Sequence, residues 1–220
     1  SSIANGISLA NLGADFGVIG NEPVLSDSRG RAYGLEFLVQ QRLFKGFYGI
    51  VALTLVRSEF TNPNTEGFVP SAWDNGLIVS MTAGKRLQRN WELGGRWRYL
   101  GGLPYTPIDV ATSSQIQIYD SRPQGVLDFN QINALRLDAF HQLDLRIDKK
   151  YFYNKWNLNW YLDIQNLYNF EAEQPPLLVP NRDANGRPIV DPTNPGSYET
   201  RLVASTAGRI LPTVGIIVEF

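Results

Sequence analysis

Apolar and polar residues alternate along seven segments of the chain, and this period of two predicts β-strands. The clearest segment is 141–151, where three aliphatic residues interleave with four polar ones, three of them charged. Such a strand cannot be packed with both faces in an ordinary apolar core. The seven predicted strands are 31–43, 47–60, 77–87, 91–100, 141–151, 156–168 and 212–220.

The connections between these strands alternate as regularly as the residues within them. Short turns at 44–46, 88–90 and 152–155 join the strands in pairs, and each has a basic residue, a Gly or Asn and an aromatic residue nearby. Long links separate the pairs; they are 61–76, 101–140 and 169–209. Links of this length are unusual in a compact soluble domain, whereas transmembrane barrels have short turns on one side and long loops on the other.

Aromatic residues gather at both ends of the predicted strands. Those beside the short turns are Phe44, Phe47, Trp91, Tyr151, Phe152, Tyr153, Trp156 and Phe220, and those at the mouths of the long links are Phe60, Tyr99, Phe140, Tyr168 and Phe170. Two such sets are typical of the interfacial girdles of a membrane protein. Strand lengths also fit the about 9 to 11 residues that a tilted strand needs to cross a bilayer. The pattern therefore predicts an all-β fold, a transmembrane antiparallel β-barrel.

Composition narrows the possible functions. The 220 residues carry a formal net charge of −1, which gives no basic face for nucleic acid. The chain has no cysteine, so thiol chemistry and disulfides are excluded, and we expect neither a metal nor another cofactor. No apolar run approaches the roughly 18 residues of a membrane-spanning helix, and the first residues lack the pattern of a signal peptide.

Six segments of the chain carry a family resemblance, although none of them is diagnostic individually. They are Gly30-Arg-Ala-Tyr-Gly-Leu-Glu-Phe-Leu38, Arg57-Ser-Glu-Phe60, Trp73-Asp-Asn75, Gly101-Gly-Leu-Pro-Tyr-Thr-Pro107, Leu143-Asp-Leu-Arg-Ile-Asp-Lys149 and Leu162-Asp-Ile-Gln-Asn166. Together they resemble the C-terminal part of the barrel of TonB-dependent outer-membrane receptors of the Bacteroidetes type. The resemblance covers about residues 8–220.

The resemblance implies a barrel of about 22 strands that surrounds an N-terminal plug domain. It also implies energised uptake of a scarce nutrient (a siderophore, glycan or peptide) in the bacterial outer membrane, with TonB contacting the plug and, in some members, a surface lipoprotein capping the barrel. The chain departs from the family because seven strands cannot enclose a plug and because no plug-like segment is evident. We therefore expect residues 1–220 to be one C-terminal part of a longer barrel, with 1–29 as the tail of an extracellular loop.

Charged residues on the polar side of the strands are expected to face the lumen, where they would contact the plug. These residues are Glu36, Glu92, Arg96, Arg98, Asp144, Arg146, Asp148 and Asp163. A symmetric hairpin around 87–91 would place Arg86 opposite Glu92, and Thr82 and Ser80 opposite Arg96 and Arg98. Both a docking surface for plug or substrate and a self-contained ladder of ion pairs fit this pattern, and the ladder is the preferred interpretation.

The long links and the last strand supply the remaining candidate residues. We expect the recognition residues for substrate to be exposed on the links; they are Trp73, Asp74, Tyr105, Asp109, Tyr119, Arg122 and Tyr198. In the resembling family the last strand is read by the β-barrel assembly machinery. The apolar residues of that predicted signal are Val214, Ile216, Val218 and Phe220.

Two further features have simple explanations. His141 is the only histidine, and the sequence has no Gly-x-Ser-x-Gly motif to accompany it. We therefore interpret His141 as a polar residue at the mouth of a loop and not as a catalytic base, and we expect the protein not to be an enzyme. The segment 181–186 resembles the start of a calcium loop, but Pro192 stands where the bidentate Glu would be needed. Asp and Asn before Gly are also ordinary turn residues.

Three alternatives remain open at this point. A complete small outer-membrane barrel with an adhesin or structural role would need 12–19 as an eighth strand, although that segment alternates poorly. A soluble carbohydrate-binding β-sandwich would explain single strands but not the alternation of the connections. A barrel enzyme would depend on His141.

Overall fold

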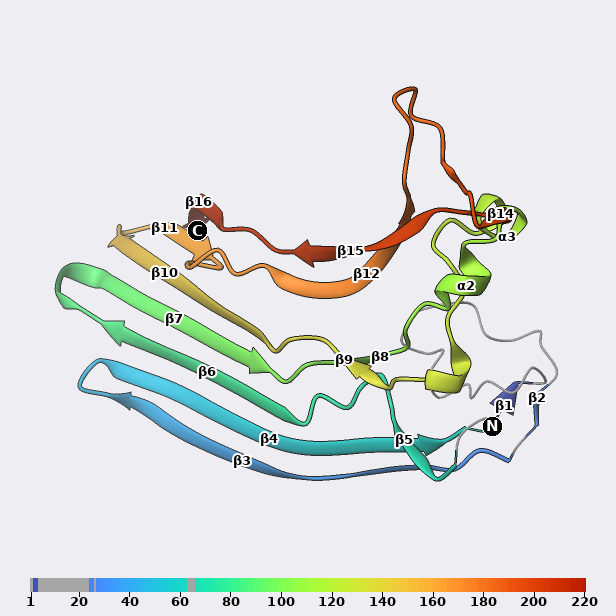
Figure 1. Cartoon of the computed structure of the whole chain (residues 1–220). Helices are drawn as coiled ribbons and strands as arrows, with labels where there is room; N and C mark the ends of the chain where they lie inside the picture. The colour runs from blue at the N-terminus through green and yellow to red at the C-terminus, as the bar shows by residue number, and fades with distance from the viewer. Residues whose placement is uncertain (1, 4–23, 26, 63–65) are drawn as a thin grey trace.

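The computed structural model describes residues 2–3, 24–25, 27–62 and 66–220. Its main element is an antiparallel sheet in which the strands follow one another in chain order (Figure 1). The strands are β3 (Gly30–Phe44), β4 (Phe47–Thr61), β6 (Leu77–Arg86), β7 (Trp91–Leu100), β10 (Phe140–Phe152), β11 (Asn157–Gln165) and β16 (Leu211–Glu219). The seven strands predicted from the alternation are thus confirmed within about one to three residues at most boundaries.

Short turns lie at one end of this sheet and long links at the other (Figure 1). Lys45 and Gly46 both have positive φ, 49° and 79°, which suits the two-residue turn between β3 and β4. Beside the β10–β11 turn, Tyr153 stacks on Trp156 with ring centroids 4.3 Å apart. Glu219 pairs with Asn157, so the end of β16 lies at the short-turn end.

The sheet has one apolar face and one polar face, because paired residues share a side. The apolar face includes Leu53, Val79, Met81, Trp97, Leu145, Leu162 and Val214, which lie side by side across successive strands. The polar face includes Thr54, Ser80, Thr82, Arg96, Arg98, Asp144, Arg146 and Asp163. Within the described residues, β3 and β16 are the edges of an open sheet.

Two tyrosines on the polar face cover glycines of the neighbouring strand. Tyr48 pairs with Gly84 and Tyr161 with Gly215, and each ring occupies the space that a side chain at the glycine would need. The Arg146 guanidinium in turn lies 4.0 Å from the centre of the Tyr161 ring. These contacts fix the rings flat against the sheet.

The long links contain secondary structure that the alternation did not reveal. The first holds β5 (Phe68–Pro70), which pairs with β4. The second holds β8 (Pro104–Tyr105), α2 (Val110–Ser113), α3 (Ile116–Ser121), η3 (Phe129–Gln131) and β9 (Leu135–Arg136). The third is a long hairpin of β12 (Ala172–Pro180) and β15 (Thr200–Ala207), which also carries β13 (Val190–Asp191) and β14 (Asn194–Tyr198).

The hairpin β12–β15 follows directly from the pair β11–β16 after an interruption at 166–171 and 208–210. Asn166 has a φ of 54°, and its amide exchanges hydrogen bonds of 2.8 Å with the backbone of Phe170 in both directions. Gly208 has a φ of 119° on the opposite strand, a conformation that suits glycine. The interruption redirects the hairpin over the end of the sheet.

Buried side chains are concentrated at the long-link end. Phe60, Ile132 and Leu178 are the buried apolar residues of the described chain. Phe60 is only 2% exposed, and Phe140 shares the polar face with Leu100, so the expectation that both belong to an exposed aromatic girdle is wrong. None of the helices in the described ranges is long and apolar enough to cross a membrane. The proposed closing strand 12–19 and most of 1–29 lie outside the described residues.

Candidate functional site

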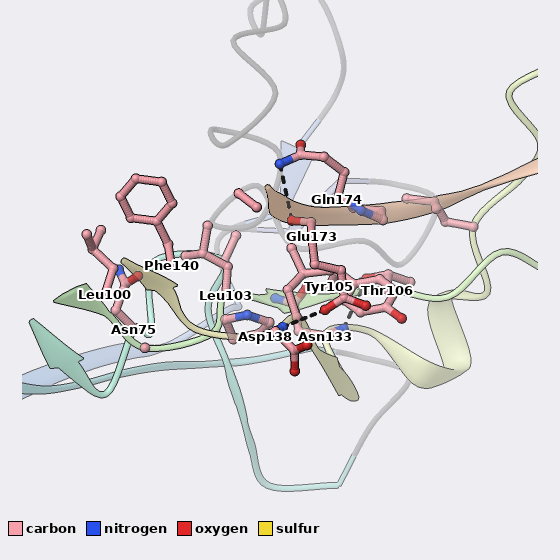
Figure 2. Close-up of a pocket in the computed structure, with 17 residues that line it drawn as sticks. Asn75, Leu100, Leu103, Tyr105, Thr106, Asn133, Asp138, Phe140, Glu173 and Gln174 are labelled. Carbon is pink, nitrogen blue, oxygen red and sulfur yellow. Dashed lines mark hydrogen bonds between the residues drawn. The ribbon is translucent and has the colours of Figure 1, made fainter. Parts of the chain in front are cut away.

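A cavity of about 640 Å³ lies where the long links meet the polar face at the ends of β7 and β10 (Figure 2). Its volume falls within the about 300–1,000 Å³ that is usual for small-molecule sites. The side chains of Leu100, Leu103 and Phe140 lie at one end, and those of Tyr105, Asp138 and Glu173 lie toward the other (Figure 2). The lining is completed by Ala72, Asn75, Gly101, Pro104, Thr106, Leu127, Asn133, Leu137, Ala172, Gln174 and Pro175.

Tyr105 is held at the cavity by the short ladder between β8 and β9, in which it pairs with Leu135. The next residue, Thr106, is buried; its hydroxyl accepts a hydrogen bond of 3.0 Å from the backbone N–H of Asn133. The side-chain amide of Asn133 also donates to the carbonyl of Pro70 at 2.8 Å. The first and second long links are therefore joined beneath the cavity.

Glu173 brings the third long link to the same cavity. Its Oε2 accepts a hydrogen bond of 2.5 Å from the backbone N–H of Asp138. Both side chains are exposed, and among the described residues they are the only carboxylic acids that line the cavity. No Lys, Arg or His of the described chain is among the lining residues. Arg98 approaches the Phe140 ring to 6.0 Å, but its guanidinium pairs with Asp144 at 3.5 Å.

Asp74 is buried, so the expectation that it is an exposed recognition residue is wrong. It is 0% exposed, and its Oδ1 accepts a hydrogen bond of 2.8 Å from the backbone N–H of Ser58. Its Oδ2 forms an ion pair with Arg136 and lies 3.5 Å from Nη1 of Arg57. Nη1 of Arg136 also donates to the carbonyls of Asp74 at 2.6 Å and Gly102 at 2.8 Å. Asp74 therefore joins two long links to β4 next to the cavity.

Asp109 has a local structural role as the N-cap of α2. Its Oδ1 accepts from the backbone N–H of Thr112 at 3.0 Å, and its Oδ2 accepts from the Thr112 hydroxyl at 2.5 Å. These hydrogen bonds, that of the hydroxyl first, lower the pKa of the Asp109 carboxyl below its usual range. The side chain is committed to the helix start and does not line the cavity.

The other loop candidates lie on separate surfaces. Trp73 is exposed and lines a small hollow beside Arg31 on β3, and Arg122 is exposed at the end of α3. Tyr119 packs edge-on against Tyr198, with ring centroids 5.7 Å apart. Of the predicted recognition residues, the structure thus places only Tyr105 in the cavity.

The charged residues of the polar face form ion pairs with one another. Nη2 of Arg96 lies 2.9 Å from Oδ2 of Asp144, and Nε of Arg146 lies 2.9 Å from Oδ2 of Asp148. Asp144 also accepts from the side chain of Gln142 at 2.6 Å. The register confirms that Arg86 faces Glu92 and that Thr82 and Ser80 face Arg96 and Arg98. Ion pairs are thus present for Glu92, Arg96, Arg98, Asp144, Arg146 and Asp148, whereas Asp163 and Glu36 form none within the described residues, and contact with a plug or substrate stays a prediction.

Glu36 differs from these residues because it lies on the edge strand β3, opposite Thr54. Its side chain is exposed, and it forms no hydrogen bond or ion pair with the described part of the chain. The residues Val214, Ile216 and Val218 lie on the apolar face of the opposite edge strand, and Phe220 is fully exposed. Their proposed roles in plug contact and barrel assembly stay predictions.

His141 lies at the start of β10 on the apolar side, opposite Tyr99. Its Nδ1 is 2.7 Å from the hydroxyl of Tyr168, and its ring is 4.1 Å from that of Phe170. His141 therefore hydrogen-bonds to a phenol within the described chain, whereas the enzyme alternative needs a serine and a carboxylate as its partners.

The segment 181–186 forms the turn of the hairpin. Oδ1 of Asp183 accepts from the backbone N–H groups of Asn185 at 2.9 Å and Arg187 at 2.8 Å, as in an Asx turn. Gly186 has a φ of 79°. Asp183 therefore stabilises this turn, as the interpretation of an ordinary turn expects.

Comparisons with known proteins found no similarity: no family model and no curated protein sequence matches the chain. The geometry is therefore the basis for a proposed function.

The sequence prediction missed Asp138, Glu173 and Phe140 as cavity residues and Arg136 as the partner of Asp74. Only Phe140 carried a signal, since its position just before an alternating segment places it at a strand end.

Proposed function

We propose that this chain forms part of the barrel wall and the extracellular loops of a TonB-dependent outer-membrane receptor that imports a scarce nutrient. The observation that carries the proposal is an apolar face of the sheet that no other sheet of the described chain covers. Met81, Leu93 and Val214 on that face are 43%, 41% and 63% exposed, whereas the opposite face carries the ion pairs of Arg96 and Arg146. A soluble sheet places its apolar face inside, but a membrane barrel turns that face to lipid and its polar face to the lumen.

Two further features support the same function. Short turns at one end and long, structured links at the other agree with the periplasmic and extracellular sides of such barrels. The cavity at the long-link end lies where a nutrient would arrive from outside. The edge strands β3 and β16 would pair with further strands of the barrel. The ion-pair ladder would face the plug domain inside the barrel, and TonB would act on the receptor through that plug.

This function assigns the partners of each surface. Outer-membrane lipid would cover the apolar face, the β-barrel assembly machinery would read β16 and Phe220, and a surface lipoprotein would cap the long links if one is present. A β-sandwich would need a second sheet against the apolar face, and the main sheet has no such partner in the described ranges.

Neighbouring positions in the central strand β6 test the lipid face. Met81 on the apolar face lies opposite Val51 and Trp97, whereas Thr82 on the polar face lies opposite Ile50 and Arg96. A carboxylate in the bilayer centre costs about 2 kcal/mol, whereas one beside Arg96 can pair with it. We expect Met81→Asp to reduce the folded protein in outer-membrane fractions about tenfold or more and Thr82→Asp to leave it within about twofold.

The experiment uses the protein expressed from its natural coding sequence, and it measures folded protein that only detergent extracts from washed membranes. Equal loss or equal tolerance of the two variants would contradict the lipid-facing assignment. Transport is tested separately by growth of a deletion strain on single nutrients as the sole source. A strain that grows as well as its parent on every nutrient at limiting concentration would contradict the importer.

A further inference from the structure

The cavity at the long-link end has a charge pattern that restricts what it can bind. Asp138 and Glu173 are carboxylates at its polar end, and its lining includes no basic side chain of the described chain. Neither carboxylate has a recorded ion pair in the described part of the chain. An anionic ligand would therefore meet repulsion from both carboxylates, because the basic side chains near the lining, Arg136 and Arg98, are paired with Asp74 and Asp144.

The rest of the lining is largely apolar and aromatic. Leu100, Leu103 and Phe140 form one end, and Tyr105 lies toward the other end, with Asp138 and Glu173 (Figure 2). Apolar walls of this kind bind an apolar group by removing it from water. Aromatic faces such as that of Tyr105 also attract cations that have lost part of their hydration.

The Glu173 carboxylate is held in place although its side chain is exposed. Its Oε2 accepts the 2.5 Å hydrogen bond from the backbone N–H of Asp138, which fixes the Glu173 carboxylate at the cavity. The second oxygen of Glu173 and the carboxylate of Asp138 make no hydrogen bond with the described chain, so they are available to a donor from a ligand. Two carboxylates that line one cavity favour a cationic ligand.

We infer that the cavity binds a ligand that combines an apolar body with a positively charged amine or guanidinium group, such as a short basic peptide. The apolar group lies at the Leu100, Leu103 and Phe140 end, and the cation lies between Asp138 and Glu173. This inference rests on the proposed function, because it names the class of nutrient that the importer would take.

Three dipeptide amides test the inference on the intact protein in detergent. They are N-acetyl-Phe-Arg-amide with a guanidinium, N-acetyl-Phe-citrulline-amide as its neutral isostere, and N-acetyl-Phe-Glu-amide with a carboxylate. Binding is measured by calorimetry at low salt, because screening weakens contacts between exposed charges. We expect the Arg probe to bind roughly 10-fold more tightly than the citrulline probe and the Glu probe to bind more weakly than both.

The variants Glu173→Gln and Asp138→Asn remove one charge each while keeping the side-chain shape, and the amide introduced by Glu173→Gln retains an oxygen that accepts the Asp138 N–H. Each is expected to weaken the Arg probe roughly 3- to 10-fold and to leave the citrulline probe within about twofold. Glu171→Gln is the matched control, because Glu171 is an exposed carboxylate on the same link that does not line the cavity. It should change neither affinity.

Equal affinity for the Arg and citrulline probes, a preference for the Glu probe, or no binding of any probe would overturn the inference. These results are distinguishable from failure of the proposed function. A protein that assembles in the outer membrane and supports nutrient uptake, but shows no preference for the cationic probe, would support the proposed importer and contradict the inferred ligand class. A protein that binds the Arg probe preferentially, but is found outside the outer membrane, would support the inferred ligand class of the cavity and contradict the proposed importer.

Discussion

Removing the buried carboxylate of Asp74 should loosen the links that form one wall of the cavity. In Asp74→Ala the backbone N–H of Ser58 loses its 2.8 Å acceptor while it remains shielded from water, which costs about 1–3 kcal/mol. The ion pairs to Arg136 and Arg57 are lost as well, but these side chains are 38% and 48% exposed and can be rehydrated. Each exposed pair is therefore worth only about 0.2–1 kcal/mol.

The sum is about 1.4–5 kcal/mol of local stability, which corresponds to a roughly 10- to 5,000-fold increase in the opening equilibrium of the first link. Hydrogen exchange of a peptide covering 71–77 measures this opening, because its amides bond within the link. Examples are the N–H groups of Asp74 and Leu77, which donate to Ser71 and Asn75 at 3.0 and 2.8 Å. Asp74→Asn retains an acceptor for Ser58, so its exchange should rise only about 5- to 10-fold.

Asp128→Ala is the control, because Asp128 is a carboxylate of the second link that caps η3 and makes no recorded contact with 71–77. It should leave the exchange of that peptide unchanged. Equal effects of Asn and Ala at position 74, or an increase below about threefold for Ala, would refute the role of Asp74 as the residue that joins the links.

Two further predictions concern the sheet and the helix α2. Gly215→Ala should displace Tyr161 and lower the free energy of unfolding, measured in urea, by about 1–3 kcal/mol. Gly94→Ala is the control, because a methyl group has room there, and it should change the free energy of unfolding by less than about 0.5 kcal/mol. Equal effects of the two variants would contradict the contact between the Tyr161 ring and Gly215. Asp109→Ala should speed hydrogen exchange of the Thr112 amide above pH 4, because the variant lacks the carboxylate that caps α2. Folding lowers the pKa of the Asp109 carboxyl, so the parent protein loses this stabilisation of the helix only as the pH falls through the lowered pKa. Variant and parent should therefore converge toward pH 2, and a difference that persists there would contradict the cap as a carboxylate effect.

The sheet could be predicted from the sequence because its signals are local. Alternation within each segment sets the two faces, and a short turn fixes the register of the pair it joins, which is why Ser80 and Thr82 were correctly placed opposite Arg98 and Arg96. The ion-pair ladder follows from that register. These inferences needed no knowledge of distant contacts.

The cavity could not be predicted in the same way. The partner of Asp74 is Arg136, 62 residues away, and nothing in the local sequence distinguishes a carboxylate that joins two links from one that faces solvent. The hairpin β12–β15 was missed because its pairing shifts register between Gln174 and Leu177, around two prolines. Glu173 contacts the second link through the backbone of Asp138, 35 residues away, and no local pattern indicates that contact.

Spin labels along β6 test the central claim that the apolar face contacts lipid. The chain has no cysteine, so single cysteines at positions 79 to 83 can be labelled one at a time in the protein reconstituted in a bilayer. Accessibility to oxygen, which dissolves in lipid, is compared with accessibility to a water-soluble nickel chelate. Labels at Val79, Met81 and Ala83 should be accessible to oxygen and protected from the chelate, whereas labels at Ser80 and Thr82 should lack the high oxygen accessibility. Equal accessibility at all five positions, or chelate access to 79, 81 and 83, would contradict a membrane-facing sheet.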